Sequence, residues 1–430
     1  MINMFLKKLI AKILNYHSYY IWILYLLGAV ILVAEIAAFN ISPLNFHHIY
    51  GEGAEGKGRD FNAFYFAGYR LRTGNEFYYV RQVNEFLPGE HERRIWRFIY
   101  PPLLAYVFVP FSLLSMPVAF IWYTYAVLIL FGASIFLITH FLTDKLRARL
   151  AIGIMFLLSP IMWMHLAHGQ TDILVLFSLV ASFYFLTRFR PKLAGFFIGI
   201  AVLLKFTPLI FVPYLFLKNK KAFFSSTITI VGVSLLLGVD RLLNFIKGLT
   251  IYSGAWVTSS IFSNGLMGVF YNHLTRSVLS FSVSQLVYYI IILISVAFFF
   301  LLLYRQIKIN RTSSNEFFVL SEFAFLTSLM VLLPSISLIY NGIHLLFLLL
   351  IWWYFRECKT FSLRKQLFLD ILMFLIFGQP LLTSWFQTTP GSLLFVLRPV
   401  YILIFLIISF KEYTKITYEQ QSQNRIGKGV

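Results

Sequence analysis

The stretch MPVAFIWYTYAVLILFGASIFLITHFL, residues 116–142, decides the fold class, because it contains no Asp, Glu, Lys or Arg. A helix that crosses a membrane needs about 20 apolar residues, so this stretch is long enough to span one. Comparable apolar runs occur at 19–39, 149–165, 171–187, 222–239, 281–303, 316–333, 338–355, 367–383 and 392–410. The sequence therefore predicts an all-α integral membrane protein.

Composition supports the same fold class. Of the 430 residues, 59% are hydrophobic and 12% are charged, whereas soluble domains carry about 25% charged residues. Lipid must therefore be the solvent for much of the exterior. The net charge of +19 does not indicate nucleic-acid binding, because the Lys and Arg residues lie in short clusters between apolar runs, as orientation signals do. The single cysteine, Cys358, excludes an intramolecular disulfide and a CxxC metal or redox site.

The distribution of Lys and Arg predicts the orientation of the chain. The two termini and the loops that we assign to the cytoplasm hold 23 of the 36 Lys and Arg residues. Those loops lie near 143–149, 188–192, 218–221, 304–311 and 356–365. The alternation requires the short apolar runs 192–204 and 206–217 to form a hairpin with Lys205 at its outer tip. The result is a protein of the cytoplasmic membrane with about twelve transmembrane helices.

The chain is predicted to form a single polytopic domain, 1–430, with a cytoplasmic tail at 411–430. A long outer loop, 40–115, follows the first span and carries interfacial helices. Its segment 40–99 holds 8 Lys and Arg residues, but long loops translocate largely regardless of charge. We see no internal repeat, which counts against a secondary transporter. This layout indicates an enzyme whose active site faces outwards.

The first polar cluster, Arg59-Asp60-Phe61, begins an apolar and aromatic run with helical spacing that includes Tyr65. Such a helix would lie along the membrane interface and hold Asp60 close to the surface. A carboxylate in that position can act as a general base towards a hydroxyl acceptor. The alternative is a structural helix N-cap, since Asp precedes a helical run.

Two further motifs combine turn residues with polar side chains. Proline forces the preceding residue to be extended and tolerates the first helical position, so Tyr100-Pro101-Pro102 predicts a sharp helix start. In HLAHGQTD, residues 165–172, Gly169 can end one helix and Thr171 or Asp172 can cap the next. His168 and Gln170 then project from a tight outer turn and suit sugar hydroxyls. The alternative is that they are structural turn residues whose polar groups are hydrogen-bonded within the protein.

Lys205 lies between two runs that are each too short to span the membrane. Thr207 as N-cap and Pro208 at the first helical position mark a new helix. A buried ammonium is costly in a membrane and usually functional, and a helix N-terminus is itself an anion site. Lys205 is therefore a candidate for contact with a phosphate, the alternative being a lysine that extends to the interface.

Later outer segments supply additional candidates. We predict phosphate contacts from His344, Arg276 and Arg398, and substrate contacts from Tyr340 and Asn341. For these residues a structural or lipid-headgroup role is the alternative. No nucleotide-binding or zinc-protease motif is visible, and no DxD-type pair lies in an outer loop. The sequence therefore predicts neither a metal nor a cofactor.

Four strings in order give the chain a resemblance to a known family: RDF-AFY with the following RTGNEFYY, YPPL at 100–103, HGQTD at 168–172 and the AG-F-GIAVLLKFTP of 194–208. The chain resembles family-87 glycosyltransferases of the GT-C superfamily, over about the first 220 residues. The resemblance implies a GT-C fold and an inverting transfer in which Asp60 deprotonates the acceptor. The family often has a histidine in a later outer turn, whereas here His344 follows one helical turn beyond Pro334–Asn341.

Taken together, these features predict transfer of a mannose or another hexose or pentose from a polyprenyl phosphate sugar to a glycan or lipid acceptor. The expected partners are this donor, the acceptor and membrane lipids. Arg59, Tyr65, Tyr100 and Asp172 complete the predicted substrate-binding set. The alternatives are a lipid or glycan transporter, which should carry ionisable groups at the midplane of several spans, and a non-catalytic subunit of an envelope assembly.

Overall fold

The computed structural model describes residues 59–78, 98–157, 159–252, 316–332, 339–357, 362–377, 399–409 and 411–412, with single positions between 290 and 307. Its helices are α3 (Arg59–Arg72), α4 (Pro102–Phe108), η3 (Phe111–Leu113), α5 (Met116–Ile138), α6 (Lys145–Leu157), α7 (Pro160–His168), α8 (Asp172–Thr187), α9 (Pro191–Leu204), η4 (Thr207–Ile210), α10 (Phe211–Lys218), α11 (Lys220–Leu237), α12 (Val239–Tyr252), α15 (Glu316–Leu332), η6 (Ile339–Leu345), α16 (Leu346–Glu357) and α17 (Leu363–Phe377). No strand occurs in this part of the chain, so the all-α prediction is confirmed there.

Two of the described helices, α5 and α11, are long and apolar enough to cross a membrane. Several others, including α8 and α9, are apolar but shorter. Side chains on the outer faces of the long helices remain apolar: Ile129 on α5 is 71% exposed and Leu236 on α11 is 86% exposed. A helix that is apolar on all sides is typical of a membrane span. The number of twelve spans stays a prediction, and the run 19–39 lies outside the described residues.

The predicted run 149–165 is not one continuous helix, because the structure divides it into α6 and α7. Pro160 occupies the first position of α7, and the Ser159 side chain accepts a hydrogen bond from the Ile161 amide at 3.2 Å. Proline lacks an amide proton and clashes with the preceding turn, so it begins a helix instead of continuing one. The run 338–355 likewise begins as the 3-10 helix η6 before α16.

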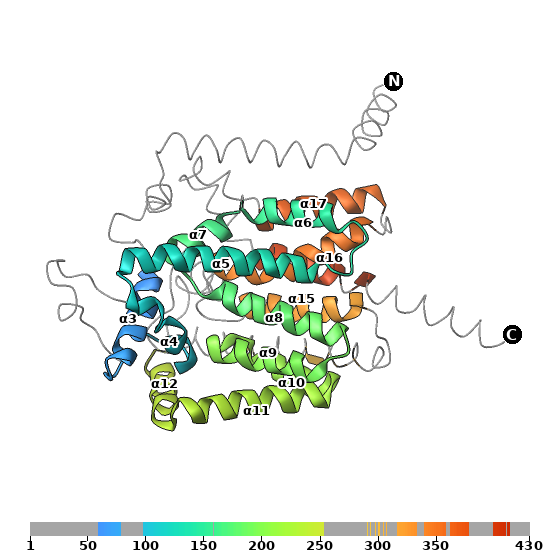
Figure 1. The fold of residues 1–430 in the computed structure, drawn as a ribbon. Helices are drawn as coiled ribbons and strands as arrows, with labels where there is room; N and C mark the ends of the chain where they lie inside the picture. Colours follow the sequence, from blue (N-terminus) through green and yellow to red (C-terminus); the bar gives the residue numbers. More distant parts are fainter. Residues whose placement is uncertain are drawn as a thin grey trace, which may run out of the picture.

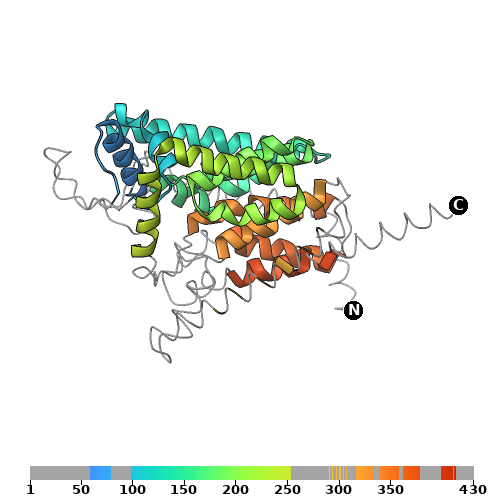
Figure 2. The same cartoon turned by 90° about the horizontal axis from the view of Figure 1, so that it is seen from below.

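The helices α8, α9 and α11 run side by side along the bundle, next to α5 (Figure 1). The short helices α3, α4 and α12 lie together at one end (Figure 1), and the view from below shows α3 in blue and α12 in yellow-green at that same end (Figure 2). We call this the α3 end. Asn244 on α12 donates a hydrogen bond at 3.2 Å to Glu76, which follows α3. The α3 end is therefore tied together by segments distant in sequence.

The two short runs around Lys205 form the predicted hairpin. Helix α9 runs towards the α3 end and stops at Leu204, and η4 with α10 leads back. The predicted start of the second helix is wrong by one residue, because Phe206 is the N-cap of η4, and Thr207 and Pro208 are already helical. Buried contacts fix α10 to the second half of the chain, since Glu322 on α15 bonds Tyr214 at 2.8 Å and Lys218 at 2.9 Å.

A close approach of α9 and α11 gives the first testable prediction. A Cβ atom on Gly195 would lie 2.0 Å from the Ala222 carbonyl oxygen, so Gly195→Ala must separate the two helices. We expect a loss of about 1–3 kcal/mol of stability, as for other overpacked sites. Gly132→Ala on α5 is the control, because its Cβ would meet nothing within 4 Å. Thermal unfolding in detergent measures both, and equal melting temperatures for the two variants would contradict the prediction.

Candidate active site at the α3 end

The α7–α8 turn brings the predicted site residues together. Gly169 has a φ of 64°, and amide bonds from Gly169 to Leu166 and from Gln170 to His165, both 3.1 Å, close the end of α7. This is the Schellman arrangement that favours glycine. A Cβ on Gly169 would also lie 2.6 Å from the Cβ of Phe61 on α3. The glycine therefore allows both the sharp turn and the approach of α3, which carries Asp60.

Asp60 lies in the first turn of α3 and faces the α7–α8 turn. The side-chain amide Nε2 of Gln170 donates a hydrogen bond to Asp60 Oδ2, and His168 Nδ1 lies 3.5 Å from the same oxygen. The Asp60 side chain is 22% exposed, whereas Gln170 is fully buried. Tyr123 of α5 donates a 2.6 Å hydrogen bond to the Gln170 carbonyl and fixes the turn. The carboxylate is thus positioned by protein groups and retains access to solvent.

A second carboxylate, Asp172, has a different environment. It is fully buried, and its two oxygens accept hydrogen bonds from Lys205 Nζ at 2.8 and 3.0 Å. His344 Nε2 lies 2.9 Å from Asp172 Oδ1. We call Asp172, Lys205 and His344 the Asp172 cluster. It joins α8, the α9–η4 turn and η6, so it completes the α3 end with a residue from the second half of the chain.

The Asp172 cluster supplies a counter-ion that the sequence analysis did not assign to Lys205. The buried ammonium is compensated within the protein, as buried charges generally must be. The Lys205 side chain keeps 14% of its surface exposed, and Nδ1 of His344 and Oδ1 of Asn341 have no hydrogen-bond partner among the described residues. Buried polar atoms normally find partners. Contact of Lys205 and His344 with a phosphate stays a prediction that this geometry permits.

Tyr100 lies close to both carboxylates. Desolvation of its phenol raises the pKa well above the usual range, and the negative charges of Asp60 and Asp172 raise the pKa further. The phenol therefore stays protonated and can donate a hydrogen bond. Its carbonyl accepts a 2.9 Å bond from Tyr78, and Pro101 and Pro102 begin α4 immediately after it, as the sequence predicts.

The remaining predicted residues are less closely connected to this site. The Tyr65 hydroxyl donates to the Leu114 carbonyl at 2.8 Å, and desolvation raises its pKa. Arg59 and Tyr340 are described only as backbone, in α3 and η6. Arg276 and Arg398 lie outside the described residues. The structure therefore brings together Asp60, Tyr100, His168, Gln170, Asp172, Lys205, Asn341 and His344 in or beside one end of the bundle.

Sequence reasoning missed two residues that shape the site. His165 is fully buried, and its Nε2 accepts a 3.2 Å bond from the Ile173 amide. The imidazole thereby accepts a hydrogen bond from a free backbone amide in the first turn of α8. The sequence predicts this capping role for Thr171 or Asp172, but the Thr171 side chain makes no capping bond. The HxxH spacing within HLAHGQTD was the available signal for His165. No local signal marked Tyr123, because it lies in the middle of an apolar run.

Comparisons with known proteins agree with the family resemblance, in a region that contains three of the four strings and does not include the one with Asp60. The chain is 27% identical over 156 residues to the polyprenol-phosphate-mannose-dependent alpha-(1-2)-phosphatidylinositol mannoside mannosyltransferase of Mycobacterium tuberculosis (strain ATCC 25618 / H37Rv). This similarity covers 33% of the chain and spans 36% of the relative's length. Residues 98–335 match glycosyltransferase family 87. They include Gln170, Asp172 and Lys205. Because this match extends over more than half of the sequence, the chain belongs to glycosyltransferase family 87.

Proposed function

We propose that this protein is an inverting GT-C glycosyltransferase that moves a sugar from a polyprenyl phosphate donor to a glycan or lipid acceptor. The observation that carries the proposal is the pairing of two unlike carboxylate environments at the α3 end. Asp60 is partly exposed and accepts a hydrogen bond from the neutral side-chain amide of Gln170, whereas Asp172 is buried between the Lys205 ammonium and the His344 imidazole. Groups whose environments differ in this way suit different roles in one reaction.

In the proposed reaction, Asp60 accepts the proton of the acceptor hydroxyl. The acceptor oxygen attacks the anomeric carbon from the face opposite the phosphate, and the bond between that carbon and the phosphate oxygen breaks. Polyprenyl phosphate leaves with one more negative charge than it carried in the donor. Positioned donors that meet developing charge are commonly the largest single contribution to catalysis. Lys205 and His344 are the groups proposed to meet it, with Arg276 and Arg398 as further candidates.

The substrate hydroxyls are proposed to contact Tyr100, His168, Gln170 and Asn341, together with Arg59, Tyr65 and Tyr340. The direct contact from Asp172 that the sequence predicts is not proposed, because its carboxylate is fully buried against Lys205 and His344. Mannose is the sugar that we favour, because the similar mycobacterial enzyme is named for a polyprenol phosphate mannose donor. The polyprenyl tail keeps the donor in the bilayer. We propose that the protein lies in the cytoplasmic membrane with both termini inside and the α3 end outside.

Transfer can be tested directly with purified protein in liposomes. Radiolabelled polyprenyl phosphate mannose is expected to yield a labelled glycan or glycolipid and free polyprenyl phosphate in equal amounts. Mannose of inverted anomeric configuration in the product would support the proposed single displacement. Movement of the labelled lipid between leaflets without a new glycosidic bond would instead favour the transporter alternative and overturn the proposal.

A further inference from the structure

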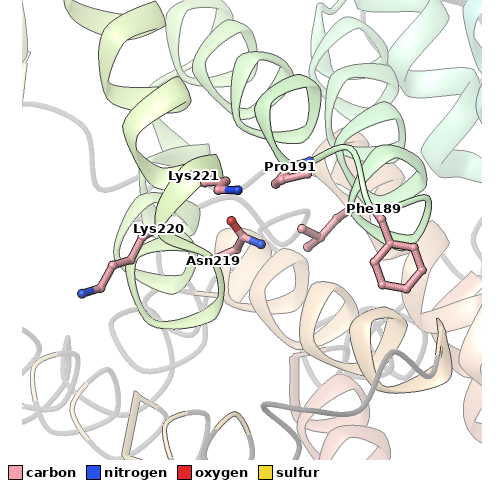
Figure 3. Close-up of a pocket in the computed structure, with 6 residues that line it drawn as sticks. Phe189, Pro191, Asn219, Lys220 and Lys221 are labelled. Carbon is pink, nitrogen blue, oxygen red and sulfur yellow. The ribbon is translucent and has the colours of Figure 1, made fainter.

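A hollow of about 330 Å³ lies at the end of the bundle opposite Asp60. It is formed where the α8–α9 turn meets the α10–α11 turn, and its lining residues are Leu186, Phe189, Pro191, Asn219, Lys220 and Lys221. Figure 3 shows Asn219 and Lys221 on one side, facing Pro191 and Phe189 on the other. Helix α8 starts at Asp172 in the candidate site and ends at Thr187 beside this hollow. The two locations are thus separated by the length of a helix.

Cations surround the hollow. Lys220 and Lys221 line it, and Arg190 and Lys192 belong to the turn that forms its other side; all four residues are exposed. The ion pairs seen within the described residues involve none of these four. Clustered charges of one sign raise the local concentration of an opposite ion. The hollow is therefore suited to an anionic group.

Phe189 has an uncommon backbone conformation at the rim. Its φ is 58°, the left-handed value that favours glycine. Amide bonds from Phe189 to Leu186 at 3.3 Å and from Arg190 to Phe185 at 2.8 Å form the same Schellman arrangement as at Gly169. The residue is nevertheless 76% exposed, so no packing in the described structure accounts for a strained, bulky residue here. Such outliers cluster at functional sites.

The surface around the hollow distinguishes a lipid from a soluble anion. Next to the cations, Phe189, Phe216 and Phe224 are 76%, 51% and 59% exposed. Helix α9 has 14 residues, or roughly 21 Å, which is shorter than a bilayer core of about 30 Å. Its two ends therefore cannot both reach the headgroups, and the turn at 188–192 is the end expected there, because it carries three cations of the kind that mark the cytoplasmic surface. A ligand that covers exposed phenylalanines and neutralises lysines carries both an apolar part and an anionic group, and a phospholipid with its acyl chains and phosphate combines the two.

We propose that this hollow binds the headgroup of an anionic glycerophospholipid. Lys221 contacts the phosphate, and Phe189 packs against the acyl chain beneath it. Lys220, whose side chain is directed away from Pro191 and Phe189 in Figure 3, adds to the positive field at the rim of the hollow. The frame is preorganised, because α9 and α11 touch at Gly195 and Ala222, and Ser225 donates a 2.6 Å bond to the Lys192 carbonyl. The inference assumes the membrane placement proposed above but not glycosyl transfer. The turns 188–192 and 218–221 are those that the charge distribution assigns to the cytoplasmic leaflet, where anionic lipids are abundant.

The test measures lipid retained by the purified full-length protein. Protein in neutral micelles containing equal phosphatidylglycerol and phosphatidylcholine is washed, and bound lipid is identified by native mass spectrometry. Wild type is expected to retain phosphatidylglycerol preferentially. The double variant Lys220→Gln/Lys221→Gln is expected to reduce this preference about 30-fold, because each cation near a membrane surface contributes about 1 kcal/mol to the binding of anionic lipid. Lys145→Gln/Arg147→Gln removes two cations from the start of α6 and is expected to leave the preference unchanged.

A second variant separates lipid binding from folding. Phe189→Gly relieves the left-handed strain, so its melting temperature in detergent should rise, while retention of phosphatidylglycerol should fall. A purely structural Phe189 would not give this combination. The proposal is overturned if either Phe189→Gly or the Lys220/Lys221 variant retains phosphatidylglycerol as wild type does, or if the control variant loses it equally. Displacement of the lipid by inorganic phosphate would also overturn it, since that outcome identifies a site for soluble anions.

Discussion

Asp60→Asn is expected to reduce the rate of glycosyl transfer by about 10²–10⁴-fold, the usual effect of losing a general base. Asparagine preserves the shape of the side chain and can still accept a bond from Gln170, which holds Asp60 in the structure. What it loses is the ability to take a proton from the acceptor. The measurement is kcat with labelled polyprenyl phosphate mannose in liposomes, together with thermal unfolding of the same preparation.

Asp144→Asn is the matched control for this substitution. Asp144 is an acidic residue just before α6, where it pairs with Arg147 at 3.1 Å, far along the chain from the candidate site. Its replacement should leave kcat within about twofold of wild type, because surface ion pairs contribute little. If Asp60 served only to stabilise the first turn of α3, Asp60→Asn would cost about 0.3–1 kcal/mol of stability and leave kcat unchanged. That result would remove the proposed base.

The Asp172 cluster is expected to show a large stability effect when its charges are separated. Asp172→Asn leaves the Lys205 ammonium buried beside a neutral side chain and should cost about 3–5 kcal/mol of stability. Lys205→Met leaves a buried carboxylate whose remaining hydrogen-bond partner among the described residues is His344, and should also destabilise the protein. The double variant removes both charges, so its loss should be smaller than the sum of the single losses by at least about 1 kcal/mol. Unfolding in detergent measures this cycle.

Activity of the double variant separates the two roles of Lys205. If the lysine only compensates Asp172, the double variant should recover transfer along with stability. If Lys205 also meets the leaving phosphate, the variant should be folded and slow, with a higher KM for the polyprenyl phosphate donor than wild type. If the stability losses of the two single variants add up to that of the double variant, Asp172 and Lys205 do not stabilise each other. Full recovery of transfer would exclude the proposed phosphate contact.

Local patterns predicted several of the helices well. The runs 171–187 and 222–239 correspond to α8 and α11, whose ends shift by at most a few residues. These ends are set by turn and capping residues, such as Gly169 before α8 and Asn219, whose side chain accepts from the Ala222 amide at 3.2 Å. Hydropathy alone could not divide the run 149–165, because the break depends on Pro160 and its cap.

The candidate site was only partly predictable, for a different reason. Asp60, Gln170 and Lys205 attract attention because each is polar beside an apolar segment. Their partners do not follow from spacing: Gln170 is 110 residues from Asp60, and Lys205 and His344 are 33 and 172 residues from Asp172. A sequence shows that a buried lysine needs an anion but does not show whether the anion is a side chain or a substrate. The assignment of Lys205 to a phosphate alone missed Asp172 on this account.

Lys205 lies closer to Asp172 in the sequence than His344 does, and this difference has a consequence for biosynthesis. Proteins emerge from the ribosome N-terminus first, and segments close in sequence pair sooner than distant ones. The α8–α9 hairpin can thus join Asp172 to Lys205 while most of the second half is still untranslated. His344 completes the Asp172 cluster only after η6 has been synthesised, 172 residues later. A ribosome-bound nascent chain that ends before η6 should therefore hold Lys205 and Asp172 in place yet lack a finished α3 end, so assembly of the site is a late event in the life of the polypeptide.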